Sequence, residues 1–191
     1  MTVPARRSLG AVPDSISARW ATPDGSSQAT VSLRFENGGW TADGEVTGES
    51  CNYVLRFGPD FDLRQFLLFR DVEEPDLWLA KDSSGNWGEM NGAHRPELRG
   101  CTDIELHGTP FSTAGPIRRL ALEVGGSADV LAAHVDVETL DVRPVLRRYE
   151  RTADRRWRIE ARYERPGEYE EVVVDEHGLA ISHVGRFHRL E

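Results

Sequence analysis

The sequence predicts a nearly all-β fold in which one antiparallel sheet turns back on itself, and three observations indicate it. Short stretches in which apolar and polar residues alternate recur along the chain, as in strands with one buried face. Glycine, proline, aspartate and asparagine, which favour turns, separate these stretches. With 191 residues, 39% of them hydrophobic and 29% charged, the chain is also long enough to enclose one substantial core.

The N-terminal half is expected to form successive hairpins after a loose start. Pro4 and Pro13, among small polar residues, mark residues 1–15 as a flexible arm, so that a single β domain spans residues 16–191. Residues 61–70 contain a continuous apolar run, which favours a buried strand and leaves a helix as the alternative. The other strands of this half are expected at residues 28–36, 40–49, 51–57, 77–81 and 86–90.

The C-terminal half shows the clearest alternation. In residues 155–164, Trp157, Ile159, Ala161 and Tyr163 would share one face of a strand, while charged residues occupy the other. Strands are expected here at residues 119–124, 130–137, 140–151, 155–164, 169–175 and 179–190. No stretch of the chain predicts a helix that would interrupt this pattern.

Composition and charge limit the partners and the location. The formal net charge of −9 argues against nucleic acid, because phosphate binding needs a basic face. Arginines gather between residues 147 and 165, but interspersed acidic residues favour a solvated strand face; a phosphate or head-group site is the alternative. Because no apolar run suits a signal peptide or a transmembrane segment, we expect a cytoplasmic protein. Cys51 and Cys101 should then be reduced, buried thiols.

The chain has few sequence signals of catalysis. It lacks the GxSxG nucleophile elbow, the phosphate-binding loop and the GxGxxG dinucleotide motif, so we expect no cofactor. Asp103, Glu105 and His107 fall on one face of a predicted strand, where they would suit a metal or acid–base catalysis. Such a trio is also common on strands that have no such function. We favour that interpretation and expect neither a metal site nor an enzyme.

The stretch from Thr109 to Leu120 has a different character. Its two prolines fix an irregular loop, which would hold the hydroxyl groups of Thr109, Ser112 and Thr113 in defined places. In a strand, Arg118 and Arg119 would point to opposite faces, and the inward one would need a partner. A salt bridge with Asp103 or Glu105 and an anionic-ligand site are equally good explanations.

These residues resemble a known family. The stretch GCTDIELHGTPFSTAGPIRRL at residues 100–120 is similar to the signature of the putative glycolipid-binding domain family. Agreement extends to GGWTADGEVTG at residues 38–48, to DSSGNW within residues 79–87, and to VDEHGLAISHVGRFHRL at residues 174–190. The resemblance implies a strongly curved, spiral antiparallel sheet, an open β-roll or half-barrel partly like the lipoprotein-carrier folds. It also implies a glycolipid ligand.

The function expected from these observations is non-enzymatic binding of an amphipathic molecule, such as a glycolipid, in a concave β-sheet cavity. Two alternatives remain open: a small-molecule enzyme that uses Asp103, Glu105 and His107, and a ligand-free interaction scaffold with a packed interior. The residues expected to hold the polar head are Arg118, Arg119, Thr109, Ser112 and Thr113, and those expected to line the tail region are Trp40, Phe111 and Trp87.

Overall fold

The computed structural model describes residues 9–70 and 74–191, and its first seven strands form an antiparallel meander. Alternate residues of these strands face the interior, as predicted; in β4 the four alternate residues from Cys51 to Phe57 are buried. Residues 61–70, where a helix was the alternative, contain a strand. The seven strands are β1 (Ser15–Ala21), β2 (Gln28–Glu36), β3 (Gly39–Val46), β4 (Cys51–Phe57), β5 (Leu63–Phe69), β6 (Leu77–Lys81) and β7 (Trp87–Glu89).

A second antiparallel meander forms the C-terminal half, and β1 pairs with its last strand. One predicted strand, residues 179–190, is two strands, because a turn at Gly185 (φ 76°) reverses the chain. Tyr163, expected on a buried strand face, is 81% exposed because the strand ends at Ala161. The six strands are β9 (Ser127–Val135), β10 (Val142–Ala153), β11 (Arg156–Ala161), β12 (Tyr169–Val174), β13 (Ala180–His183) and β14 (Phe187–Leu190).

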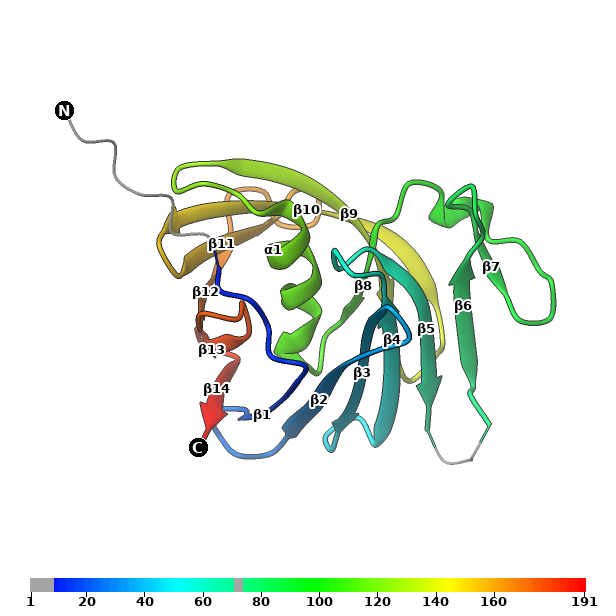
Figure 1. Ribbon diagram of the computed structural model, residues 1–191, viewed down its shortest axis with the longest axis horizontal. Coiled ribbons are helices and arrows are strands. Elements are labelled where there is room, and N and C mark those ends of the chain that lie inside the picture. The colour runs from blue at the N-terminus through cyan, green and yellow to red at the C-terminus, as the bar shows by residue number, and fades with distance from the viewer. Residues whose placement is uncertain (1–8, 71–73) are drawn as a thin grey trace.

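The segment of chain between the two meanders contains the remaining strand, at one edge of the sheet, and the helices. It contains the 3₁₀ helices η1 (Pro96–Leu98) and η2 (Pro110–Thr113), the strand β8 (Asp103–Leu106) and the helix α1 (Ala114–Leu120). β8 pairs in parallel with β9, so the sheet is mixed, whereas we expected a fully antiparallel one. The fourteen strands follow one linear order from β7 through β1 and β14 to β8, so the curved sheet does not close on itself. Figure 1 shows α1 on the concave side.

Helix α1 contradicts the strand predicted at residues 119–124. Pro116 lies in its first turn, where the missing N–H of proline removes no helical hydrogen bond, and Ala121 ends it in the left-handed region at φ 47°. We had taken this proline for the end of a loop. Among residues 9–70 and 74–191, no helix has the length and apolar character that a membrane crossing requires.

Both edges of the sheet are covered by other parts of the chain. At β7, the Arg95 N–H donates to the Trp87 carbonyl at 2.9 Å. At β8, the Ser112 hydroxyl both accepts from the Leu106 N–H at 3.0 Å and donates to the Leu106 carbonyl at 3.1 Å. Lys81 Nζ crosses from β6 and donates to the carbonyl of Thr102 at 2.9 Å. These bonds satisfy backbone groups that an open edge would leave available to another chain.

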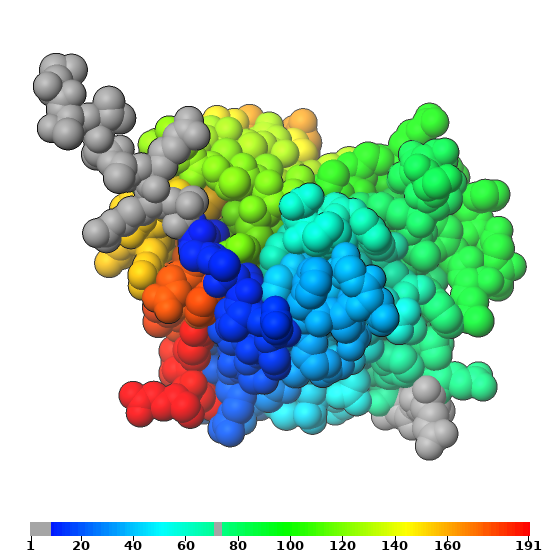
Figure 2. Space-filling model, viewed as in Figure 1, coloured from blue at the N-terminus to red at the C-terminus, as the bar shows by residue number. Residues whose placement is uncertain are grey.

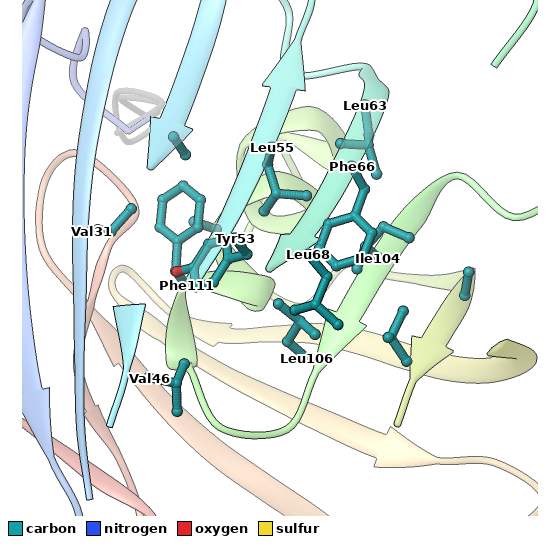
Figure 3. Close-up of a cluster of buried hydrophobic side chains, with 14 of the residues drawn as sticks. Val31, Val46, Tyr53, Leu55, Leu63, Phe66, Leu68, Ile104, Leu106 and Phe111 are labelled. Atoms are coloured by element: carbon teal, nitrogen blue, oxygen red, sulfur yellow. The ribbon is translucent and has the colours of Figure 1, made fainter. Parts of the chain in front are cut away.

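Apolar side chains fill most of the concave interior. The larger of two buried clusters joins the first meander to β8 and to residues of β9, β10 and β14. Figure 3 shows Leu55, Phe66 and Leu68 of β4 and β5 pointing towards Ile104 and Leu106 of β8. The smaller cluster joins Ile117 of α1 to β9–β13. Cys51 and Cys101 are buried thiols, as predicted.

The segment before β1 is attached to the domain. We expected residues 1–15 to form a flexible arm; residues 1–8 lie outside the described residues, and residues 9–14 contact the domain. Leu9 packs against the smaller cluster, and the Gly10 N–H donates to the Glu176 carbonyl at 2.7 Å. In Figure 2 the dark blue atoms of this segment cross the viewed face between the orange-red C-terminal strands and the light blue β2–β3 hairpin.

Candidate ligand-binding site

A partly open cavity interrupts the packing of the C-terminal half. This polar cavity of about 150 Å³ lies between β8 and η2 on one side and β9–β13 on the other. Its lining is mixed: charged and hydroxyl-bearing side chains alternate with apolar residues from several elements, namely Ile104, Leu106, Pro116, Ala132, Ile159 and Ala161. Glu105, Arg147 and other residues line both the cavity and a larger, more open groove between β10 and the loops at residues 48–50 and 136–138.

The hydroxyl groups predicted to hold a head group lie at the η2 side of this cavity. Thr109, Ser112 and Thr113 all line it, and each hydroxyl also fixes the local backbone. The Thr109 hydroxyl accepts from the Phe111 N–H and lies 3.2 Å from the Tyr53 hydroxyl. The Thr113 hydroxyl donates to the Pro110 carbonyl at 2.9 Å. The proline-bounded segment is therefore a rigid turn, as its two prolines predicted, although it continues into a helix.

Glu105 and Arg147 form the principal ion pair of the cavity wall. Arg147 Nε and Nη2 donate to the two carboxylate oxygens of Glu105, each at 2.7 Å, and His134 Nδ1 lies 3.1 Å from Glu105 Oε1. Arg147 also binds Glu164. Although burial opposes the shift, the hydrogen bonds from His134 and Arg147 lower the pKa of Glu105 to about 2. Glu105 is therefore ionised at neutral pH and held in one orientation.

A second group of ionisable residues lies at the opposite wall. His183 Nε2 is 2.6 Å from Glu170 Oε2, and Arg186 Nη1 is 3.0 Å from the same oxygen. Arg186 Nη2 donates to the His107 carbonyl at 2.7 Å, which ties the β13–β14 turn to the end of β8. Burial raises the pKa of Glu170, but the His183 hydrogen bond and the Arg186 charge outweigh it and lower this pKa to about 2.

Arg118 and Arg119 are both engaged within the protein. Arg119 Nη2 donates to Asp103 Oδ2 at 2.5 Å and contacts the Thr102 hydroxyl. This is the salt bridge that we considered as one explanation of an inward arginine, although the two arginines lie on a helix and not, as we assumed, on a strand. Arg118 Nη1 donates to the carbonyl of Gly10 at 2.8 Å, so it holds the N-terminal segment. Neither arginine lines the polar cavity.

The three aromatic residues expected near a tail belong to the packed interior. Phe111 is 1% exposed and Trp87 is 2% exposed, and the Trp87 indole donates to the Cys101 carbonyl. Trp40 stacks on Phe61 with ring centroids 5.3 Å apart. None of the three lines the polar cavity. The apolar lining there comes from other residues.

Asp103, Glu105 and His107 do reach the same cavity. The two carboxylates are bound by different arginines, and burial, with a contribution from Arg186, lowers the pKa of His107. Across the part of the chain that the structure describes, no group of three His, Cys, Asp or Glu side chains is arranged to hold a metal ion.

The sequence analysis did not identify most of the residues that line the cavity from the second meander. Arg147 and Tyr149 come from β10, Glu170 from β12, His183 from β13, and Arg186 from the turn that follows it. The alternation of β10 was a usable signal, because Arg147, Tyr149 and Arg151 share one side with the buried Val145. An arginine in phase with buried residues indicates an inward charge that needs a partner. No local signal identified Glu105 as that partner, since 42 positions separate it from Arg147.

The comparisons with known proteins agree with this architecture. The chain matches the family described as "Putative glycolipid-binding" over residues 17–189. It is similar to a crystal structure of a DUF1089 family protein from Pseudomonas aeruginosa, with a TM-score of 0.68, 26% sequence identity and coverage of 100% of both chains. It matches none of the curated proteins with which it was compared. Because the family match takes in nearly the whole chain, this protein belongs to the putative glycolipid-binding family.

Proposed function

We propose that the protein binds the polar head of a glycolipid-like amphiphile in the polar cavity without transforming it. The observation that carries this proposal is a contrast within one concave face. Apolar side chains fill the larger cluster, whereas the polar cavity is walled by two ion-pair groups, three hydroxyl-bearing residues of the Thr109–Thr113 turn and six apolar residues. A sugar has the same mixture of hydroxyl groups and apolar ring surface.

The size of the cavity limits which part of the ligand it accepts. Sites that bury a drug-sized molecule have volumes of about 300–1,000 Å³, and a water molecule occupies about 30 Å³ of liquid. A cavity of about 150 Å³ suits a head group of the order of one sugar ring and leaves no room for an acyl chain. The tail would stay outside the cavity, and not in the aromatic interior where we first expected it.

The electrostatics favour binding over acid–base catalysis. Glu105 and Glu170 both have a pKa of about 2, because arginine and histidine partners stabilise the charged forms. A general acid must carry a proton near the working pH, and a strong general base must have a higher pKa than these carboxylates. Two carboxylates held ionised by arginines are better suited to accepting hydrogen bonds from ligand hydroxyl groups.

The proposal is tested by comparing sugars that carry an alkyl tail with the same sugars without one. Methyl glycosides of glucose, galactose and mannose, and the matching octyl glycosides, are titrated by calorimetry and by thermal shift. We expect each methyl glycoside that binds to match its octyl partner within about threefold, since the tail contributes little. Tyr149→Phe removes one hydroxyl from the cavity wall and should weaken binding roughly threefold to tenfold, the usual value of a lost hydrogen bond.

Tyr163→Phe is the matched control, because Tyr163 is 81% exposed and lies outside the cavity wall. It should bind like the unaltered protein. Binding of octyl glycosides alone would place recognition in an apolar site elsewhere, and binding of neither series would remove glycosides as ligands. Equal losses in the two tyrosine variants would also contradict the proposal.

A further inference from the structure

The polar cavity is partly open, and a second space begins at its rim. That space is the larger groove between β10 and the loops at residues 48–50 and 136–138, which we call the β10 groove. The residues that line both spaces are Glu105, His107, Arg147 and Arg165. His107 and Arg165 are exposed, so a molecule held in the cavity can continue past them into the groove.

The β10 groove is large enough to hold part of a ligand. Its volume is about 820 Å³, against about 150 Å³ for the cavity. Sites that bury small molecules have volumes of about 300–1,000 Å³. Because the cavity suits a single sugar ring, the two spaces together fit a head group that is longer than a monosaccharide.

The lining of the β10 groove suits sugars better than an alkyl tail. Carboxylates and guanidinium groups line it in nearly equal numbers, five and four. Its aliphatic residues, Val135 and Val137, are 2% and 8% exposed, so they present little apolar surface. An alkyl chain there would remove water from charged groups without burying much apolar area. Since a charged ligand of either sign would meet groups of both signs, a neutral molecule rich in hydroxyl groups fits best.

Two residues of the groove have nitrogen atoms to spare for such a molecule. Arg143 Nη1 donates to Glu164 Oε1 at 3.0 Å, and the side chain of Arg143 is 52% exposed. His134 Nδ1 lies 3.1 Å from Glu105 Oε1. Among the residues that the structure describes, the other guanidinium nitrogens of Arg143 and Nε2 of His134 form no hydrogen bond. Guanidinium and imidazole nitrogens can bind sugar hydroxyl groups.

We infer that the protein recognises an oligosaccharide head group, with the terminal sugar in the polar cavity and the next sugar in the β10 groove, against Arg143 and His134. This inference rests on the proposed function and specifies its ligand class. The tail of a glycolipid is attached at the opposite end of the sugar chain from the terminal sugar. The sugars in the groove would therefore lie between the cavity and the tail, which the cavity has no room to hold.

The experiment compares single sugars with longer ones that end in the same sugar. Methyl glycosides of glucose, galactose and mannose are titrated by calorimetry beside methyl glycosides of maltose and cellobiose, of lactose and melibiose, and of two mannobioses. At least one disaccharide should bind roughly tenfold more tightly than its monosaccharide, because the second sugar adds hydrogen bonds of its own. Octyl glycosides of the single sugars should show no such gain.

Arg143→Ala removes donors from the groove and should reduce the gain of the disaccharide roughly threefold to tenfold. Binding of the methyl monosaccharide should stay unchanged, because Arg143 lies outside the cavity wall, and it also shows that the variant is folded. Arg143→Lys should keep part of the gain. Arg148→Ala is the matched control: Arg148 is also a β10 arginine with a partly exposed ion pair, but it lines neither space. It should keep the full gain.

A different open groove also reaches His107 and supplies a second control. Thr22, Asp24 and Ser26 are among the residues that line it. Ser26→Ala should leave the gain of the disaccharide unchanged. If Ser26→Ala removes the gain and Arg143→Ala does not, the second sugar lies in that other groove and the assignment to the β10 groove is wrong.

The titrations separate this inference from the proposed function. If methyl glycosides bind and no disaccharide binds more tightly, the head group is a single sugar; the inference is then wrong and head-group binding stands. An equal gain from an octyl tail would show that the groove takes an alkyl chain, which also contradicts the inference. If neither single sugars nor disaccharides bind, the proposed function fails and this inference fails with it. Binding of disaccharides alone supports both, provided that Arg143→Ala weakens it.

Discussion

The two meanders of this sheet alternate inward and outward residues in the same way, yet their interiors differ. In β4 of the first meander, the inward residues from Cys51 to Phe57 are apolar or aromatic and join the larger cluster. In β10 of the second, Arg147 and Arg151 occupy inward positions. The first interior is stabilised by apolar burial. The second also has an apolar cluster, but its inward arginines must be paired as well, and the polar cavity lies among those pairs.

The largest effect that would test this contrast is a cavity made in the apolar half. Phe66 of β5 is fully buried among the side chains shown in Figure 3. Phe66→Ala should lower the free energy of unfolding by about 4 kcal/mol, because it removes apolar contacts and leaves a void. Urea denaturation measures this change. A loss below about 1 kcal/mol would show that this interior is loosely packed.

The next largest loss of stability is expected when an inward arginine of the second meander is removed. Arg147→Met leaves Glu105 with His134 as its remaining side-chain partner, and should lower the free energy of unfolding by about 3 kcal/mol. Arg148→Met is the matched control on the neighbouring outward residue, whose pair with Asp129 is exposed and 3.4 Å long. It should change stability by less than about 0.5 kcal/mol. Similar losses in both variants would contradict the distinction between inward and outward arginines.

Acid should destabilise the protein by protonating the paired carboxylate of Glu105 in the second interior. The pKa of Glu105 lies at about 2 in the folded protein, below its ordinary value of 4.5, so its stabilisation is complete above pH 4.5 and is lost as the pH falls towards 2. The contribution is at most about 3 kcal/mol, less any screening by water in the cavity. Glu105→Gln should flatten the fall in stability between these pH values. If the free energy of unfolding falls equally steeply with pH in both proteins, Glu105 does not cause the loss of stability in acid.

Much of the fold could be predicted from the sequence because the strands carry a local signal. Alternation placed β2, β4 and β6 at the residues where they occur, and turn residues marked most boundaries. The same reasoning failed for the strand predicted at residues 119–124, since a seven-residue helix with a proline in its first turn has too little periodicity to distinguish it from a strand. Parallel pairing of β8 with β9 had no local signal, because it depends on the crossover between meanders.

The candidate site was predictable only in part. The Thr109–Thr113 turn was identified because proline and hydroxyl residues act on their own neighbourhood. The opposite wall, with Arg147, Glu170 and His183, was not identified, because ion pairs between distant residues exist only after the sheet has curved.

By itself the sequence determined most of the strands and turns, and the family, because alternation, turn chemistry and a long motif are properties of neighbouring residues. The tertiary structure decided which charges meet. It paired Asp103 with Arg119 and Glu105 with Arg147, placed the predicted aromatic residues in the core, and left one small polar space against the second meander. The physical reason is that a buried charge selects its partner by distance in three dimensions, and only the curvature of the sheet sets that distance.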